Sequence, residues 1–153
     1  MNKIQTPGSL KFGPEISKLI TCTSKDICED IMVNFDYACF YKMRSIPHGS
    51  CRLGVVRSDW NGAKIYHVFL FSYTTIVCGF TIIDDDSVIA FCTGTYSQTT
   101  RKHINRFCHE ICNDVSYYWF KDISHLSNQA VWFTDSSELA TQIVRNTNKY
   151  MGG

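Results

Sequence analysis

The sequence has few charged residues and almost no net charge, and both shortages limit what the protein can be. Charged residues make up 19% of its 153 positions, against about a quarter in an average soluble domain. Disordered chains carry more charge and fewer aromatic residues than this one, in which aromatic residues reach 14%. We therefore expect one ordered domain over residues 1–153, with irregular ends at 1–13 and 151–153. A net charge of +1 gives no general attraction to nucleic acid, which is not an expected partner.

The sequence also has no long uninterrupted apolar run. Its most apolar stretch, Ile65–Ile83, is broken by polar residues such as His67 and Ser72, whereas a membrane-spanning helix needs about 20 mainly apolar residues. The N-terminal segment lacks the continuous apolar region and the small-residue cleavage site of a secretory signal. These absences predict a cytoplasmic protein with no membrane partner.

Cysteine is the one residue type present in excess, with eight in the chain and no CxxC pair among them. Most stand beside Ile, Val or Phe, where a reduced cysteine behaves as a small buried hydrophobe. Disulfide frameworks belong mainly to short secreted chains with poor cores. The expected role is packing in a reducing cytosol, and no cofactor is expected. A zinc site using Cys108 and Cys112, or structural disulfides, are the alternatives.

The N-terminal third predicts helices. Pro14 suits the first turn of a short helix near Glu15–Ile20. A capping pattern at Thr23 and Asp26 then precedes apolar residues at helical spacing up to Ala38, which predicts a second helix that ends before the breaker Ile46–Gly49.

A β region follows, in which short turns join consecutive strands. Asn61-Gly62 is a strong hairpin signal, Asp84-Asp85-Asp86 predicts a second tight turn, and Gly79 suggests a bulge. The predicted strands are Arg52–Arg57, Lys64–Phe71, Tyr73–Ile83 and Ser87–Tyr96.

The hydrophobic period then changes from that of a strand to that of a helix. Apolar residues from Ile104 to Trp119 follow helical spacing, a short strand is predicted at Ala130–Phe133, and Asp135 with Glu138 predicts the cap of a last helix. The expected fold is α+β, an antiparallel β-meander of four to five strands with helices packed on one face.

No catalytic motif is present, so a non-enzymatic protein is expected. The chain has no P-loop, no GxGxxG and no GxSxG. Five histidines and eight cysteines make Cys–His pairs in the sequence uninformative, and the adjacent pair Cys108-His109 points apart by about 100° on a helix. The Asp84–Asp86 run lacks the alternate spacing of a calcium loop and is read as a solvated turn.

The segment Tyr96–Arg106 is the best candidate site. Hydroxyl residues end a strand there and a helix begins with basic residues, although basic side chains oppose the helix dipole by about 0.3–1 kcal/mol each. Free backbone N–H groups, hydroxyls and arginines suit a phosphate, and such a local conflict marks a place to look for function. An ordinary cap followed by a solvated helix face is the alternative. The candidate ligand-binding residues are Ser97, Thr99, Thr100, Arg101, Lys102 and Arg106, with Arg57 from a strand.

Two elements of this region also carry a resemblance. The runs Ser72–Val77 and Tyr96–His103 match the patterns SYxTxV and YSxTTxKH. Together they resemble a family of small uncharacterised proteins encoded by tailed bacteriophages, over residues 72–107. The resemblance implies a phage accessory protein in the host bacterial cytoplasm, of a size that often antagonises host defences. It assigns no activity and no binding residue.

Three hypotheses follow. The first is a non-enzymatic binding protein that sequesters a phosphorylated, nucleotide-like signal at Thr99–Arg106. Its pocket would lie at a homo-oligomer interface, because one small domain encloses little volume. The second is an inhibitor that blocks a host defence protein through exposed aromatic residues, such as Tyr117 or Phe120, and the acidic segment Asp26–Asp36. The third is a phage structural or assembly component.

Overall fold

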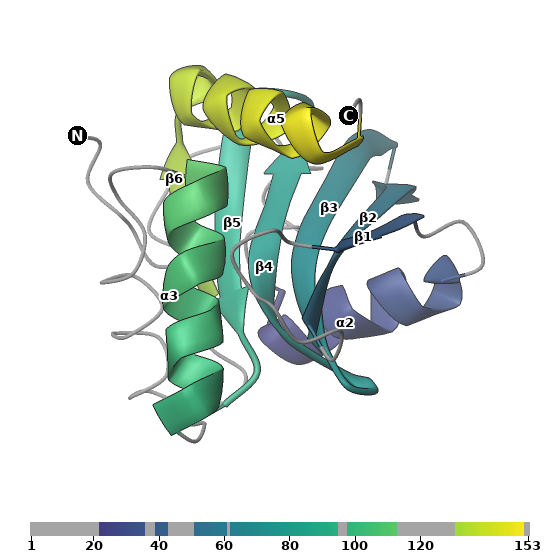
Figure 1. Ribbon diagram of the computed structural model, residues 1–153. Coiled ribbons are helices and arrows are strands. Elements are labelled where there is room, and N and C mark those ends of the chain that lie inside the picture. The colour runs from purple at the N-terminus through teal and green to yellow at the C-terminus, as the bar shows by residue number, and fades with distance from the viewer. Residues whose placement is uncertain are drawn as a thin grey trace.

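The fold is one antiparallel sheet whose strands follow each other in chain order (Figure 1). A computed structural model describes residues 22–35, 39–42, 51–60, 62–94, 98–112 and 131–151. The strands are β1 Cys39–Lys42, β2 Cys51–Trp60, β3 Ala63–Ser72, β4 Thr75–Ile83, β5 Ser87–Cys92 and β6 Val131–Asp135. The helices are α2 Ser24–Val33, α3 Gln98–Cys112 and α5 Ser137–Met151. The predicted α+β fold with an antiparallel meander is confirmed.

The sheet has six strands, and not the four to five predicted. The additional strand is β1, which lies inside the segment predicted to continue as a helix up to the breaker Ile46–Gly49. That helix ends at Val33 because Asn34 caps it: the Asn34 backbone N–H donates to carbonyls of the last turn, and its side-chain amide donates to the Asp30 carbonyl at 2.9 Å. The capping pattern at the start of this helix, Thr23 with Asp26, is confirmed.

Helices cover both faces of the sheet, so the prediction of one covered face is wrong in this respect. α3 and α5 pack on one face and α2 packs on the other. The central strands explain the difference, since every residue of β5 is buried and side chains alternate between the two faces. A strand that buries both faces needs a cover on both, and the helices are divided accordingly.

The two predicted tight turns are confirmed. Gly62 has φ +85° and donates its N–H to the Asp59 carboxylate at 3.0 Å, closing the β2–β3 hairpin. Asp84 and Asp85 have φ values of +51° and +61°, a conformation that aspartate tolerates better than most residues. The Asp84 carboxylate accepts the backbone N–H of Lys64 at 2.8 Å, so this acidic turn is tied to the neighbouring strand.

Gly79 serves close packing and not a bulge. The irregularity between β3 and β4 lies at Leu70/Phe71, away from Gly79. A Cβ atom at Gly79 would lie 2.6 Å from the Val68 carbonyl oxygen and 2.7 Å from the Phe91 ring. The absence of a side chain therefore lets Phe91 pack directly on the backbone of β4.

The ends of several elements differ from the predictions. β5 ends at Cys92, before the predicted limit, while β6 continues to Asp135. The cap of α5 is therefore Ser136, whose hydroxyl accepts the Leu139 N–H at 3.0 Å. Met151, predicted to be irregular, is the last residue of α5 and packs against the core. The predictions for 1–13, 15–20, 113–120 and 152–153 lie outside the described residues.

Candidate ligand site at the start of α3

α3 is held on the sheet by one apolar face. Its buried side chains are Ile104, Phe107, Cys108, Ile111 and Cys112, which confirms the predicted helical spacing within this range. The Phe107 ring stacks on Phe80 of β4 with centroids 5.9 Å apart. This packing fixes the orientation of the helix and turns its polar face to solvent.

The solvent face of α3 begins with positive charge that no described residue compensates by an ion pair. Arg101, Lys102 and Arg106 are exposed, and the first turn contains no acidic residue. None of the three forms an ion pair with another residue of the described ranges. Arg101 stands at the end of the first turn, where a cation opposes the helix dipole, and the three charges together favour an anion on this surface.

The remaining predicted ligand-binding residues give less support to an anion site. Thr100 is half-buried and Thr99 lies in the first turn of α3, where only its backbone is described; Ser97 is outside the described residues. Arg57 is exposed and stacks over the Tyr66 ring at 5.2 Å. It stands six residues along β2 from Cys51, about 20 Å at roughly 3.3 Å per residue. The structure therefore does not bring Arg57 to the start of α3.

A contact between Cys51 and His103 lies at the end of the sheet where β2 begins and β3 ends. The Cys51 Sγ is 2.9 Å from the His103 Nδ1 and 3.8 Å from the Ser72 hydroxyl. Cys51 opens β2, Ser72 closes β3 and the two are paired across the strands. Sequence reasoning missed this group because the contact spans 52 positions and exists only once α3 has packed on the sheet.

Most of the described cysteines are buried, as their predicted packing role requires. The seven with described side chains are free thiols, and five of them, Cys51, Cys78, Cys92, Cys108 and Cys112, are buried. Burial raises the pKa of Cys22 and of Cys28 to about 12 and also raises the pKa of Cys78 and Cys92. Among the described residues no group of three or more His, Cys, Asp or Glu side chains is arranged to hold a metal ion.

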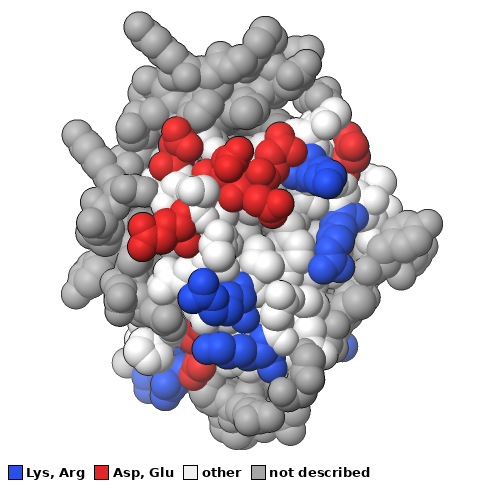
Figure 2. Space-filling model, turned by 90° about the horizontal axis from the view of Figure 1, so that it is seen from above, with Lys and Arg blue, Asp and Glu red and all other residues white. Residues whose placement is uncertain are grey.

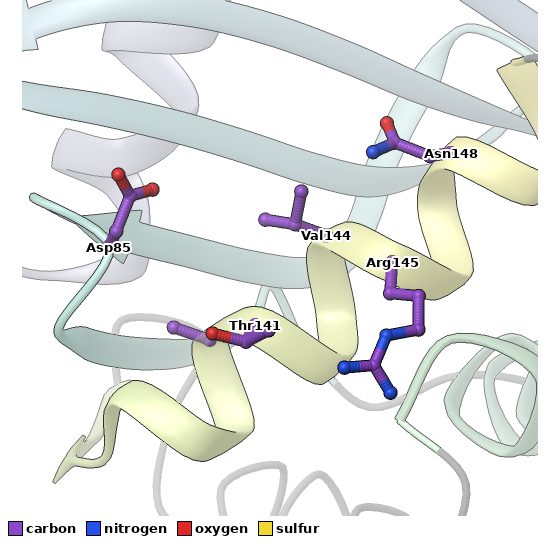
Figure 3. Close-up of a pocket in the computed structure, with 6 residues that line it drawn as sticks. Asp85, Thr141, Val144, Arg145 and Asn148 are labelled. Carbon is purple, nitrogen blue, oxygen red and sulfur yellow. The ribbon is translucent and has the colours of Figure 1, made fainter.

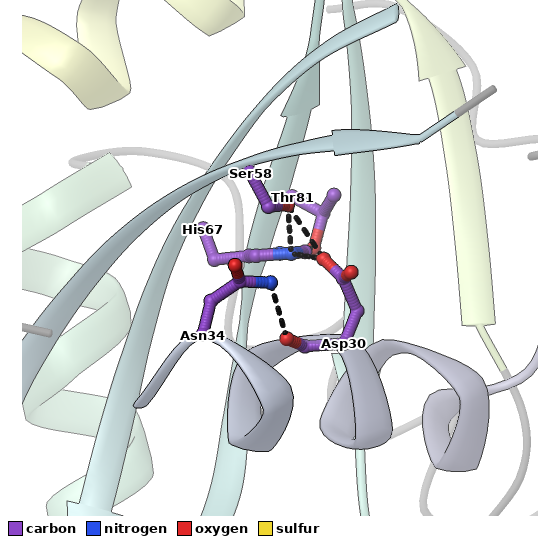
Figure 4. A network of polar contacts seen from close by, with 5 residues as sticks. All are labelled: Asp30, Asn34, Ser58, His67 and Thr81. Atoms are coloured by element: carbon purple, nitrogen blue, oxygen red, sulfur yellow. Dashed lines mark hydrogen bonds and ion pairs between the residues drawn. The ribbon is translucent and has the colours of Figure 1, made fainter. Parts of the chain in front are cut away.

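A second polar group joins α2 to the sheet (Figure 4). The His67 Nε2 is 2.7 Å from the Asp30 carboxylate, and the His67 Nδ1 is 2.8 Å from the Thr81 hydroxyl. Ser58 donates its hydroxyl to the same Asp30 oxygen at 2.6 Å. Every polar atom of the fully buried imidazole therefore has a partner.

The protonation of this group follows from its burial and hydrogen bonds. Burial lowers the pKa of His67, which is therefore neutral at pH 7, with Nε2–H donating to Asp30. Burial alone would raise the pKa of Asp30, but hydrogen bonds from His67 and Ser58 outweigh it and lower that pKa. Because the Asp30 carboxylate occupies the His67 Nε2, the imidazole is not placed to take a proton from Ser58. We interpret the group as structural.

An open hollow of about 310 Å³ lies between α5 and the Asp84–Asp86 turn (Figure 3). It is lined by Asp85, Ala140, Thr141, Val144, Arg145 and Asn148. The Arg145 side chain extends away from Asp85, so the two charged groups of the hollow do not converge on one point. On the face seen from above, acidic side chains gather in one area, and basic side chains lie both beside them and farther away (Figure 2). The hollow contains none of the predicted ligand-binding residues.

The fold and the site together define a small α+β protein with a six-stranded meander and a basic helix start. The chain belongs to a family of unknown function (DUF8033), which matches residues 36–121, more than half of its length. The match includes Cys51, Ser72, His103 and the basic residues of α3. No curated protein and no solved structure gives a significant match. None of the described helices is long and apolar enough to cross a membrane.

Proposed function

We propose that the chain is a non-enzymatic binding protein that captures a phosphorylated small molecule of the nucleotide class on the first turns of α3. The observation that carries the proposal is the uncompensated charge of Arg101, Lys102 and Arg106, which are exposed and form no ion pair with a described residue. A phosphate at a helix start accepts backbone N–H groups and is favoured by the dipole. Its charge also offsets the repulsion between Arg101, at the end of the first turn, and that dipole.

Spacing along α3 supports the same proposal. Lys102 and Arg106 stand four residues apart and therefore share one side of the helix. A guanidinium binds phosphate oxygens in a bidentate manner, while an ammonium acts as a point charge. Together they suit a ligand with one or two phosphate groups.

An exposed aromatic residue stands at the same end of the sheet. Tyr73 follows Ser72, which contacts Cys51 and is thereby connected to His103 of α3. The Tyr73 side chain is 74% exposed, and the Tyr73 φ is +52°, a strained value for an aromatic residue. Strained backbone is frequent at ligand sites, and an exposed aromatic ring offers a stacking surface for a base.

The resemblance to small bacteriophage proteins extends the proposal to a biological role. A protein of this kind, present in an infected bacterial cell, would withdraw a nucleotide signal from host defence. An oligomer would enclose more of the ligand than the solvent-exposed face of α3 does alone. Homo-oligomerisation is therefore part of the proposal.

Native mass spectrometry and thermal-shift screening of the full chain test the proposal. We expect an oligomer that retains a nucleotide-like mass, or unfolding temperatures raised by cyclic nucleotides or ADP-ribose. A ligand at about 100 times its Kd stabilises a folded protein by about 2.7 kcal/mol. Mass spectra without ligand, together with unchanged unfolding temperatures across the panel, would contradict the proposal.

One observation favours a second candidate, direct inhibition of a host protein. α2 exposes two apolar side chains at its C-terminal end, Met32 at 54% and Val33 at 82%, beside acidic residues of the same helix such as Glu29. An exposed apolar pair with an acidic border suits a basic protein partner. Recovery of one host protein in stoichiometric amount, lost in a Met32→Ser/Val33→Ser variant, would favour this candidate.

A further inference from the structure

We propose that Cys51 and His103 form a nucleophilic thiol site, at which a small anionic disulfide is exchanged to leave a mixed disulfide on Cys51. The inference does not depend on nucleotide binding. It rests on the placement of a thiol, an imidazole and a hydroxyl at the end of the sheet, next to the basic face of α3.

The distance between the thiol and the imidazole permits proton transfer. At 2.9 Å, the Cys51 thiol donates to the neutral His103 Nδ1, or Nδ1–H of the imidazolium donates to the thiolate. A thiolate is the reactive form of cysteine, and an adjacent imidazole is the usual base that generates it. The Ser72 hydroxyl, 3.8 Å from Sγ, gives the sulfur a second polar neighbour.

Four other thiols of the chain are disfavoured as nucleophiles by their burial. Burial raises the pKa of Cys22, Cys28, Cys78 and Cys92, so these thiols keep their protons at neutral pH. Cys51 is fully buried as well, but it has a base at hydrogen-bonding distance. The contact with His103 is therefore what distinguishes the Cys51 thiol from these four thiols.

Cys51 is fully buried, but it stands at the end of the sheet. It is the first residue of β2 and pairs with the last residue of β3, directly before the exposed Tyr73. His103, which contacts the sulfur, is itself half-buried in the second turn of α3. Helix ends open locally at a much lower free energy than the whole domain, so opening the first turns of α3 would give a reagent access to the sulfur.

The surrounding charge selects the class of reagent. Lys102 adjoins His103 in the sequence and Arg106 follows one turn later, and both are exposed. Two cations beside an opening site raise the local concentration of anions. A disulfide that carries carboxylates, such as oxidised glutathione, fits this environment better than a neutral disulfide of similar size.

The exchange is balanced without any further reagent. His103 takes the Cys51 proton, and the Cys51 sulfur attacks one sulfur of the disulfide. A new S–S bond forms as the original one breaks, and the released thiolate takes the proton from His103. Cys51 is oxidised to the mixed disulfide, and the departing half of the reagent is reduced to a thiol.

Peptide mapping of the full chain after incubation with oxidised glutathione tests the proposal. The measured quantity is the ratio of adduct at Cys51 to adduct at Cys108, which lies on the buried face of α3 and corrects for general opening of that helix. We expect a ratio of at least about ten, because the thiolate is the form that reacts. His103→Gln should lower the ratio about tenfold or more, as loss of a general base does.

Two controls keep the result decisive. Cys51→Ser checks the assignment of the adduct, which should disappear from the peptide that carries position 51. Lys102→Gln/Arg106→Gln should slow the reaction with oxidised glutathione but not with bis(2-hydroxyethyl) disulfide, which is neutral. Equal labelling of Cys51 and Cys108, no adduct on the folded protein, or a ratio unchanged by His103→Gln would overturn the proposal. Nucleotide affinity is measured separately on Cys51→Ser, which removes the thiol but keeps the basic residues of α3. That measurement distinguishes failure of the thiol proposal from failure of the proposed function.

Discussion

The Nε2 atom of His67 lies 2.7 Å from the Oδ2 atom of Asp30, and this contact anchors α2 to the centre of the sheet. The imidazole is fully buried and the carboxylate side chain is only 12% exposed. Ser58 and Thr81 complete the hydrogen bonding of the pair. Buried polar groups with complete hydrogen bonding specify how two elements pack, so this contact should control both the stability and the pH response of the domain.

Acid should destabilise the protein in two steps. Burial lowers the pKa of His67 from 6.5, so below pH 6.5 the unfolded chain binds a proton that the folded chain does not. Asp30, whose folded pKa lies below 3.8, adds a second loss of stability as pH falls through that value. Urea unfolding between pH 7.5 and 3 measures the effect. A His67→Leu variant should lose the first step, and a wild-type free energy of unfolding that rises from pH 7 to pH 5 would contradict this account.

Removal of the Asp30 carboxylate should cost about 3 kcal/mol, because it leaves buried donors of His67 and Ser58 without an acceptor. Asp30→Ala should show the full loss in urea unfolding, and Asp30→Asn, which keeps one acceptor, a smaller one. Glu29→Ala, an exposed change on the same helix, should stay within about 0.5 kcal/mol. Equal stability of Asp30→Ala and Glu29→Ala would show that the contact does not hold α2.

Gly79→Ala should destabilise the domain by about 1–3 kcal/mol, as overpacking of a core does. The added Cβ would lie 2.6 Å from the Val68 carbonyl oxygen, a backbone atom that cannot move without disturbing β3. Gly62→Asn is the matched control, since no atom lies within 4 Å of that position and asparagine tolerates its positive φ. Thermal unfolding of both variants checks the prediction. A neutral Gly79→Ala variant would mean that the sheet adjusts around Phe91.

Local signals in the sequence predicted the parts of the fold that short segments determine. The Asn61-Gly62 hairpin, the Asp84–Asp86 turn and the Thr23–Asp26 cap each depend on residues within a few positions of one another. The solvated face of α3 was predictable for the same reason, because helical spacing separates its buried and exposed residues.

Long-range packing determines the features of the fold and the site that the local signals do not predict. Helical spacing continued past Val33, but the Asn34 cap ends α2 and β1 follows as a strand. The division of helices between two faces depends on how the whole sheet buries its strands. The Cys51–His103 contact also forms only in the folded chain, and no local pattern indicates it. The sequence alone does not give the distance between Arg57 and α3, because that distance depends on the strand register.

Calorimetric titration with cyclic nucleotides and ADP-ribose tests the central proposal most directly. The comparison is between the wild-type chain, Lys102→Gln/Arg106→Gln, and Lys149→Gln, which removes an exposed cation from the last turn of α5. We predict that at least one ligand binds the wild type, and that the double variant raises its Kd about tenfold or more, since a charged hydrogen bond contributes about 1.5–3 kcal/mol. Lys149→Gln should bind like the wild type. No binding by the wild type, or equal affinity in the double variant, would contradict the account.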